Sequence, residues 1–260
     1  MVYVMLSRVQ CLSQLYILES IPVDKIKPFP EALEELKRME KLDISKSEEF
    51  DPSHFKIVSL NTRSLNAHIE DIKCDKDILM SHVLCLQETC LTDQHPRGEF
   101  ALDGKQVELI NRGSRGIATY YPQNFQPVAR VSEETYQMTS LKSNDLIIIN
   151  IYRSSDCNDM CLLENLKNLI SSDDKSIIIC GDFNICQREE FNHPVLSFLK
   201  RNNFIAGFDP PQATHVRGRC IDQVYSKLQK NIKILKVCRS PSYFSDHCKV
   251  NITLQVSKQD

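Results

Sequence analysis

The sequence predicts a layered α/β domain across residues 54–257, and three observations lead to this prediction. Apolar runs alternate there with polar loops and with segments of helical periodicity. Runs such as "LIIINIY" lack a polar face, so both sides of their sheet must be covered. With 260 residues, of which 42% are hydrophobic and 25% charged, the chain is long enough to bury a large core. Packed layers of helices and sheets satisfy all three conditions.

Six segments of this domain are expected to be strands and three to be helices, from their apolar patterns and their flanking turn residues. The strands are expected at 55–61, 82–89, 115–122, 145–153, 176–184 and 249–256. The helices are expected at 66–80, 159–171 and 191–202. No internal repeat or low-complexity tract interrupts the domain.

The first 53 residues differ in character from the rest. Residues 1–45 contain the apolar "VYVMLSRVQCLSQLYIL", the proline-rich "PVDKIKPFP" and the helix-like "PEALEELKRMEK", whose acidic residues come early and basic residues late. That order complements the dipole of a helix. Residues 46–53 are polar and contain a proline, which predicts a linker. The domain boundary is therefore expected near residue 54.

Charge and cysteine content limit the kinds of partner and compartment. The formal net charge is −2, but residues 200–239 hold nine Lys or Arg against two Asp, which suits a phosphate-rich partner as well as a solvated face. The eleven cysteines form no C-x-x-C pair, which favours a reduced intracellular compartment over a disulfide framework or a zinc site. No apolar run approaches the ~20 residues that span a bilayer, so we expect no membrane partner.

Polar residues recur at the ends of the predicted strands. Any one of them is commonly a turn or cap residue, but an ordered set predicts a functional site. The set comprises Asn61, Gln87, Glu88, Asn150, Tyr152, Asp182, Asn184, Asp222, Ser245, Asp246 and His247.

This ordered set resembles the endonuclease/exonuclease/phosphatase superfamily, the fold of apurinic endonucleases and non-LTR retrotransposon nucleases. The matching motifs are "LNTRSL", "LQET", "NIYR", "GDFN", the Thr214–His215 pair, "IDQVY" and "SDH", and they extend across 54–257. The resemblance implies a four-layered α/β sandwich: two mixed, mostly antiparallel sheets packed face to face and flanked by helices. It also implies phosphodiester hydrolysis with Mg²⁺, or Mn²⁺, as the cofactor.

The resemblance assigns the metal-binding role to three residues. Glu88 is expected to be the principal ligand, because a carboxylate is a hard oxygen donor. Asp246 is expected on the metal side, and Asn61 is expected to help hold the metal and the carboxylate network. Many repair enzymes of the group carry an aspartate two residues after this asparagine, where the present chain has Arg63. That departure argues against a repair-type abasic endonuclease, and a contact of Arg63 with phosphate is a hypothesis.

The remaining residues are assigned to water and phosphate. Asp182 is expected to orient or deprotonate the attacking water, and Asn184 to donate a hydrogen bond to the phosphate. His247 is expected to contact the phosphate, with its pKa raised by Asp222. The hydroxyl of Tyr152 would also reach the phosphate, although a core aromatic with a polar tip is an equal alternative.

About twenty residues at the N-terminus resemble the last conserved motif of PIF-type helicases, in which Arg8 would match the arginine that reaches a γ-phosphate. The chain contains no G-x-x-x-x-G-K-[ST] loop, so this polypeptide is not expected to act as a helicase. A helicase tail followed by a nuclease resembles the C-terminal end of a Helitron-like transposon protein. We therefore expect 1–45 to be a helicase remnant and the protein to be nuclear.

The sequence thus predicts a Mg²⁺-dependent endonuclease of transposable-element origin that acts on nucleic acid, with DNA favoured. Two alternatives stay open. One is a phosphodiesterase or phosphatase of the same fold that acts on RNA tails, protein–nucleotide adducts or phospholipid headgroups. The other is an inactive nucleic-acid-binding remnant, against which the intact set of motif residues speaks.

Overall fold

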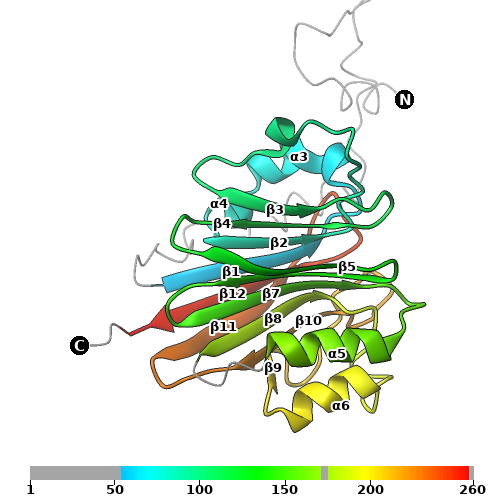
Figure 1. The fold of residues 1–260 in the computed structure, drawn as a ribbon, viewed down its shortest axis with the longest axis vertical. Coiled ribbons are helices and arrows are strands. Elements are labelled where there is room, and N and C mark those ends of the chain that lie inside the picture. The colour runs from blue at the N-terminus through cyan, green and yellow to red at the C-terminus, as the bar shows by residue number, and fades with distance from the viewer. Residues whose placement is uncertain (1–53, 171–174, 258–260) are drawn as a thin grey trace, which may run out of the picture. The chain divides into compact units, whose positions relative to one another are not determined.

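A computed structural model describes residues 54–170 and 175–257 of the chain (Figure 1). These residues belong to the second of two units into which the chain divides, Met1–Phe50 and Asp51–Asp260. The predicted helicase remnant (1–45) and linker (46–53) lie outside the described residues.

The described elements follow one another as mixed strands and short helices. In chain order they are β1 (His54–Asn61), α3 (Leu65–Cys74), α4 (Lys76–Leu79), β2 (Val83–Gln87), the 3-10 helix η4 (Arg97–Phe100), β3 (Gln106–Ile110), β4 (Ile117–Tyr121), β5 (Gln126–Ser132), β6 (Tyr136–Lys142), β7 (Leu146–Arg153), α5 (Asp159–Leu169), β8 (Ser176–Asp182), α6 (Pro194–Arg201), β9 (Ile205–Ala206), β10 (Asp222–Lys227), β11 (Ile232–Ser240) and β12 (Lys249–Val256).

The described strands form two six-stranded sheets. One sheet has the order β11-β12-β1-β2-β4-β3, and the other has the order β5-β6-β7-β8-β10-β9. Within the described part of the chain, β1 with β2 and β7 with β8 are the parallel pairs, and the other neighbours are antiparallel. The prediction of two mixed, mostly antiparallel sheets is confirmed.

The sheets and helices stack in four layers (Figure 1). Between the sheets, Ile57 and Val83 pack with Ile148 and Ile178 in one apolar cluster. On the outer face of the first sheet, the side chains of α3 and α4 cover β1 and β2. On the outer face of the second sheet, the side chains of α5 and α6 cover β7 and β8. This is the four-layered sandwich that the sequence predicted.

The alternation of side chains along β7 explains why "LIIINIY" has no polar face. Ile149 and Ile151 pack against Leu162 of α5, whereas Ile148 packs against the opposite sheet. Successive residues of a strand point to opposite faces, and here both faces are buried. Buried Cys180 of β8 packs between the sheets as part of the same apolar cluster as Ile148.

Two predicted helices have different limits in the structure. The expected helix 66–80 is two helices, because Asp75 leaves the helical conformation, with a ψ of 114°, and caps α4 by accepting a hydrogen bond from the Ile78 N–H. The expected helix 191–202 begins only at Pro194, where the side chain of His193 caps the first turn. None of the described helices is long and apolar enough to cross a membrane.

Candidate active site

The polar strand ends meet because of the register of the two sheets. In the first sheet, Asn61 ends β1 beside Gln87 of the parallel β2. In the second, Asp182 ends β8 and is paired with Asp222, which begins the antiparallel β10. The "SDH" segment immediately precedes β12, which runs antiparallel to β1. Strand direction therefore gathers residues from distant motifs at one end of the sandwich.

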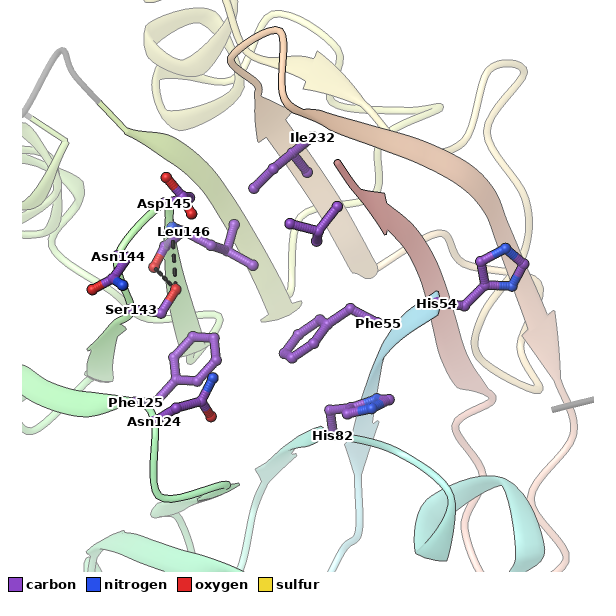
Figure 2. Close-up of a pocket in the computed structure, with 11 residues that line it drawn as sticks. His54, Phe55, His82, Asn124, Phe125, Ser143, Asn144, Asp145, Leu146 and Ile232 are labelled. Carbon is purple, nitrogen blue, oxygen red and sulfur yellow. Dashed lines mark hydrogen bonds between the residues drawn. The ribbon is translucent and has the colours of Figure 1, made fainter. Parts of the chain in front are cut away.

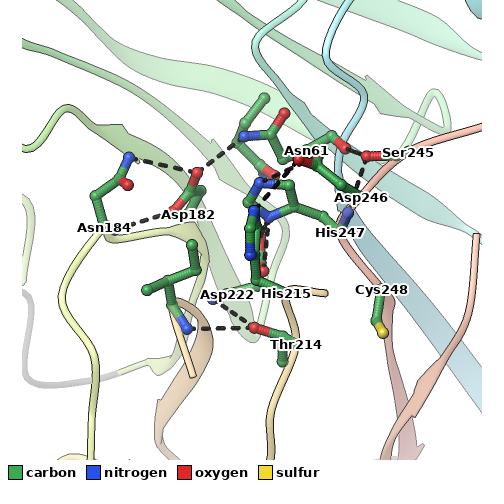
Figure 3. Close-up of polar contacts among 12 residues, drawn as sticks. Asn61, Asp182, Asn184, Thr214, His215, Asp222, Ser245, Asp246, His247 and Cys248 are labelled. Carbon is green, nitrogen blue, oxygen red and sulfur yellow. Dashed lines mark hydrogen bonds and ion pairs between the residues drawn. The ribbon is translucent and has the colours of Figure 1, made fainter. Parts of the chain in front are cut away.

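Asp182 is buried and lies between Asn61 and Asn184 (Figure 3). Its Oδ2 accepts a hydrogen bond from Asn61 Nδ2 at 2.9 Å, and its Oδ1 accepts one from the Asn184 N–H at 2.9 Å. Burial raises the pKa of the Asp182 carboxyl to about 7, and the negative charge of Asp222 adds to this effect. The positive charge of His247 opposes it. The Asp182 carboxylate therefore has the proton affinity that suits a general base near neutral pH.

His247 and Asp222 form a buried pair. Nδ1 of His247 lies 2.8 Å and 3.0 Å from the two carboxylate oxygens of Asp222, so the imidazole donates there and its Nε2 is left for other partners. Burial alone would lower the pKa of His247, but the hydrogen bond to Asp222 and the nearby carboxylates raise it to about 9. Thr214 holds Asp222 in place, because its hydroxyl accepts a hydrogen bond from the Asp222 N–H at 3.0 Å.

Asp246 is held from two sides. Its Oδ2 accepts hydrogen bonds from Arg63 at 3.1 Å and lies 3.3 Å from Nε2 of His215. The Arg217 N–H donates to Nδ1 of His215, so Nε2 carries the ring hydrogen and donates to Asp246. The "TH" motif alone does not indicate this role for His215. Its contact with Asp246 appears only when the fold brings the two loops together.

Glu88 and Tyr152 lie beside each other in this region. Burial raises the pKa of Tyr152, and the charges of Glu88 and Asp182, with a hydrogen bond to Glu88, raise it further. The tyrosine is 5% exposed. Its ring packs with Ile110 and Ile117, and its hydroxyl lies by the Glu88 carboxylate.

The structure brings together most of the predicted residues but gives some of them different contacts. The amide nitrogen of Asn184 donates to the Arg153 carbonyl at 2.8 Å and, more weakly, to Asp182 at 3.5 Å. Gln87 and Asn150 contact each other across the sheets, since Gln87 Nε2 of β2 donates to Asn150 Oδ1 of β7 at 2.7 Å. These two strand-end amides therefore stabilise the sandwich instead of lining the site.

The backbone is strained around the site. Among the described residues other than glycine, positive φ angles occur at Arg63 (58°), Glu88 (47°), Cys90 (55°), Asn184 (50°) and Asn203 (64°). All but Asn203 follow strands that deliver site residues. Such conformations cost of order 1–3 kcal/mol and concentrate at functional sites.

The residues present fit a divalent cation. Potential ligand atoms lie within 4.8 Å of one another inside each of two groups, one of Asp182, Asp222 and His247 and the other of His215, Asp246 and His247. Glu88, the predicted principal ligand, belongs to neither group. Oδ1 of Asp246 is buried and has no hydrogen-bond partner among the described residues, which leaves a carboxylate oxygen available to an ion. Carboxylates outnumber positive charges here, and oxygen donors of this kind are those that Mg²⁺ prefers.

A separate pocket of about 310 Å³ opens where β1 and β7 begin (Figure 2). Its lining includes Phe55, His82, Phe125 and Leu146. None of the strand-end residues described above lines this pocket. It therefore lies apart from the candidate active site.

Comparisons with known proteins agree with this geometry. The sequence profile of the Endonuclease/Exonuclease/phosphatase family matches residues 58–247, which is more than half of the chain. No curated protein sequence matches the chain significantly.

Several solved structures share the fold. The human Nocturnin catalytic domain with bound sulfate has a TM-score of 0.59 and 17% identity, covering 79% of this chain and 95% of that one. An AP endonuclease from Archaeoglobus fulgidus has a TM-score of 0.60 and 16% identity, covering 76% and 98%. The endonuclease domain of TRAS1, a telomere-specific non-LTR retrotransposon, has a TM-score of 0.60 and 11% identity, covering 79% and 100%.

Proposed function

The chain belongs to the endonuclease/exonuclease/phosphatase family, and from this premise we propose that it is a divalent-metal-dependent DNA endonuclease. The observation that carries the proposal is the buried arrangement of Asp182, hydrogen-bonded to Asn61, beside the His247–Asp222 pair. Hydrolysis of a phosphodiester needs a base for the attacking water and positive charge near the phosphate. These residues supply both at one end of the sandwich.

The roles of the base and of the phosphate contact follow from the hydrogen bonds. Asn61 and the Asn184 N–H orient the Asp182 carboxylate, which accepts a proton from the attacking water. His247 is held through Nδ1 by Asp222, so its Nε2–H donates to a non-bridging phosphate oxygen. The raised pKa of His247, about 9, keeps the imidazole positively charged at neutral pH for this contact.

The cation would be Mg²⁺, or Mn²⁺, held by Glu88 and Asp246 with Asn61 supporting the network. When bound, it supplies charge neutralisation at the scissile phosphate. The hydroxyl of Tyr152 lies by the Glu88 carboxylate in the free protein and would donate to a phosphate oxygen when the substrate enters. His215 fixes the orientation of Asp246 through its Nε2–H.

Two observations support DNA as the substrate. The AP endonuclease and the TRAS1 endonuclease domain have the same fold as this chain, and both are named as endonucleases. Residues 200–239 carry the local excess of positive charge that a polyanion attracts. The likeness to the TRAS1 domain also supports an origin in a transposable element, and we further propose a nuclear location, where DNA is available.

Plasmid nicking by the full-length chain, with Mg²⁺ or with EDTA, tests the proposal. We expect nicking that requires the metal and falls at least about a hundredfold in Asp182→Asn, because that change removes the proton acceptor. The exposed Asp103→Asn is the matched control and should retain the wild-type rate.

Other substrates separate the alternatives. A generic phosphodiester that is hydrolysed while plasmid and abasic-site duplex stay intact would move the assignment to a phosphodiesterase with another substrate. DNA binding without turnover of any substrate would indicate an inactive binding module. Either result would contradict the endonuclease proposal.

A further inference from the structure

Arg63 places a positive charge between two carboxylates that we assign to the metal. One guanidinium nitrogen donates to Asp246 Oδ2 at 3.1 Å, and Nε lies 3.9 Å from Glu88 Oε2. The Arg63 side chain is 51% exposed, compared with 20% for Glu88 and 32% for Asp246. The guanidinium thus neutralises two acids that are less exposed than Arg63 itself.

The backbone at Arg63 is held firmly, so the position of its side chain is not incidental. Its N–H donates to Asn61 Oδ1 at 3.0 Å, in a left-handed conformation with φ of 58°. On either side, the Thr62 N–H donates to the Gln87 carbonyl and the Leu65 N–H donates to the Thr89 carbonyl, both at 2.9 Å. The Cα is fixed at the site, while the long exposed side chain is able to leave without any movement of the backbone.

A divalent cation and this guanidinium are attracted to the same two carboxylates, and Arg63 contacts Oδ2 of Asp246. Like charges a few ångströms apart repel, and each oxygen that faces Arg63 is less available to a metal. We propose that Arg63 competes with the divalent cation for Glu88 and Asp246, so that the metal binds only as the guanidinium leaves them. This inference rests on the proposed function, because it concerns the metal of the same site.

The exposure of Arg63 limits how strongly it can weaken metal binding. Arg63 is half exposed, and exposed ion pairs are weak because solvent screens the two charges. Removing the guanidinium is therefore expected to strengthen metal binding by about three- to tenfold. A loss of structure is not expected, since the side chain makes no contribution to the apolar core.

The test is direct measurement of cation binding without substrate, by calorimetry with Mg²⁺ and by paramagnetic resonance with Mn²⁺. Arg63→Gln should bind both ions about three- to tenfold more tightly than the wild type. Arg63→Lys keeps the charge and should stay closer to the wild type. Arg219→Gln removes a comparable arginine whose partner is Glu190, at 3.2 Å, and should leave metal affinity unchanged.

The outcomes distinguish this inference from the proposed function. If wild-type nicking requires Mg²⁺ but Arg63→Gln binds the ion no more tightly, the competition is refuted and the endonuclease stands. Equal tightening in Arg219→Gln would also refute it, because the effect would then be one of general charge. If neither wild type nor Arg63→Gln binds a divalent cation, both proposals fail.

Discussion

Gly181 offers the sharpest test of how the fold places Asp182. It precedes Asp182 in β8 and is paired with Ile151 of β7, with a φ of +145°. A Cβ at this position would lie 1.9 Å from the Ile151 carbonyl oxygen, 2.9 Å from its carbonyl carbon and 3.0 Å from its nitrogen. All three atoms belong to the backbone, so no side-chain rotation relieves the overlap.

The cost of Gly181→Ala follows from these distances. A φ in this region costs a residue with a side chain about 1–3 kcal/mol. Moving β7 away from β8 breaks ladder hydrogen bonds worth about 1 kcal/mol each and opens the packing around them. We therefore expect a loss of about 4 kcal/mol or more in the free energy of unfolding.

Urea unfolding of the full-length chain measures this cost against two control glycines. Gly113 has a φ of +60° and nothing within 4 Å of an added Cβ, so Gly113→Ala should lose only about 1 kcal/mol. Gly98 has the same open space without a positive φ, and Gly98→Ala should be near neutral. A Gly181→Ala variant no less stable than Gly113→Ala would refute the close approach of β7. If the Gly181→Ala variant is insoluble while both control variants are soluble, that result would also support the close approach of β7.

Three further predictions concern buried Lys249 and Tyr152 and half-buried His82. The Lys249 ammonium lies 2.6 Å from the carboxylate of buried Asp75, so Lys249→Met leaves that carboxylate without its positively charged partner. Urea unfolding should show a loss of about 3–5 kcal/mol in the free energy of unfolding. Adding Asp75→Asn, which removes the unpaired charge, should restore most of this loss. Burial and nearby lysines lower the pKa of His82, whose Nδ1 accepts a hydrogen bond from the Lys56 N–H. The contribution of His82 to the free energy of unfolding is therefore present above about pH 6.5 and is lost as the pH falls. Thermal unfolding of His82→Asn, which keeps an acceptor, should therefore depend less on pH between about 7 and 5, and an unchanged dependence would contradict this. Tyr152→Phe should lower plasmid nicking about tenfold with stability preserved if the hydroxyl serves the site, whereas a core aromatic would show no change.

The sequence identified the strands that are apolar along their whole length. The expected strand 145–153 is β7, and the expected strand 176–184 is β8, which ends at Asp182 as the backbone turns toward the positive φ of Asn184. Strands that carry polar residues along their length escaped the pattern, among them the largely buried β6 and β10 and the half-exposed β5 and β11. In β5 and β11, charged and polar residues alternate with apolar ones, and both strands lie at sheet edges, where one side needs no apolar cover.

The expected helix 66–80 shows why local propensity has limits. Its residues keep helical periodicity through Asp75, yet the helix breaks there. Asp75 forms an ion pair with Lys249, which lies 174 residues later in the chain. No local pattern contains that contact, so only the completed sandwich reveals what stabilises the break.

The sequence by itself determined the fold class and the chemical character of the site, because motifs such as "GDFN" and "SDH" combine an apolar strand with the polar residues at its end. What only the tertiary structure decided is which of these residues touch. The resemblance already implied that Asp222 partners His247. The contacts of Asp246 with Arg63, across 183 residues, and with His215 depend on the order and direction of the strands. Those features arise from long-range packing between sheets, which no local stretch of sequence encodes.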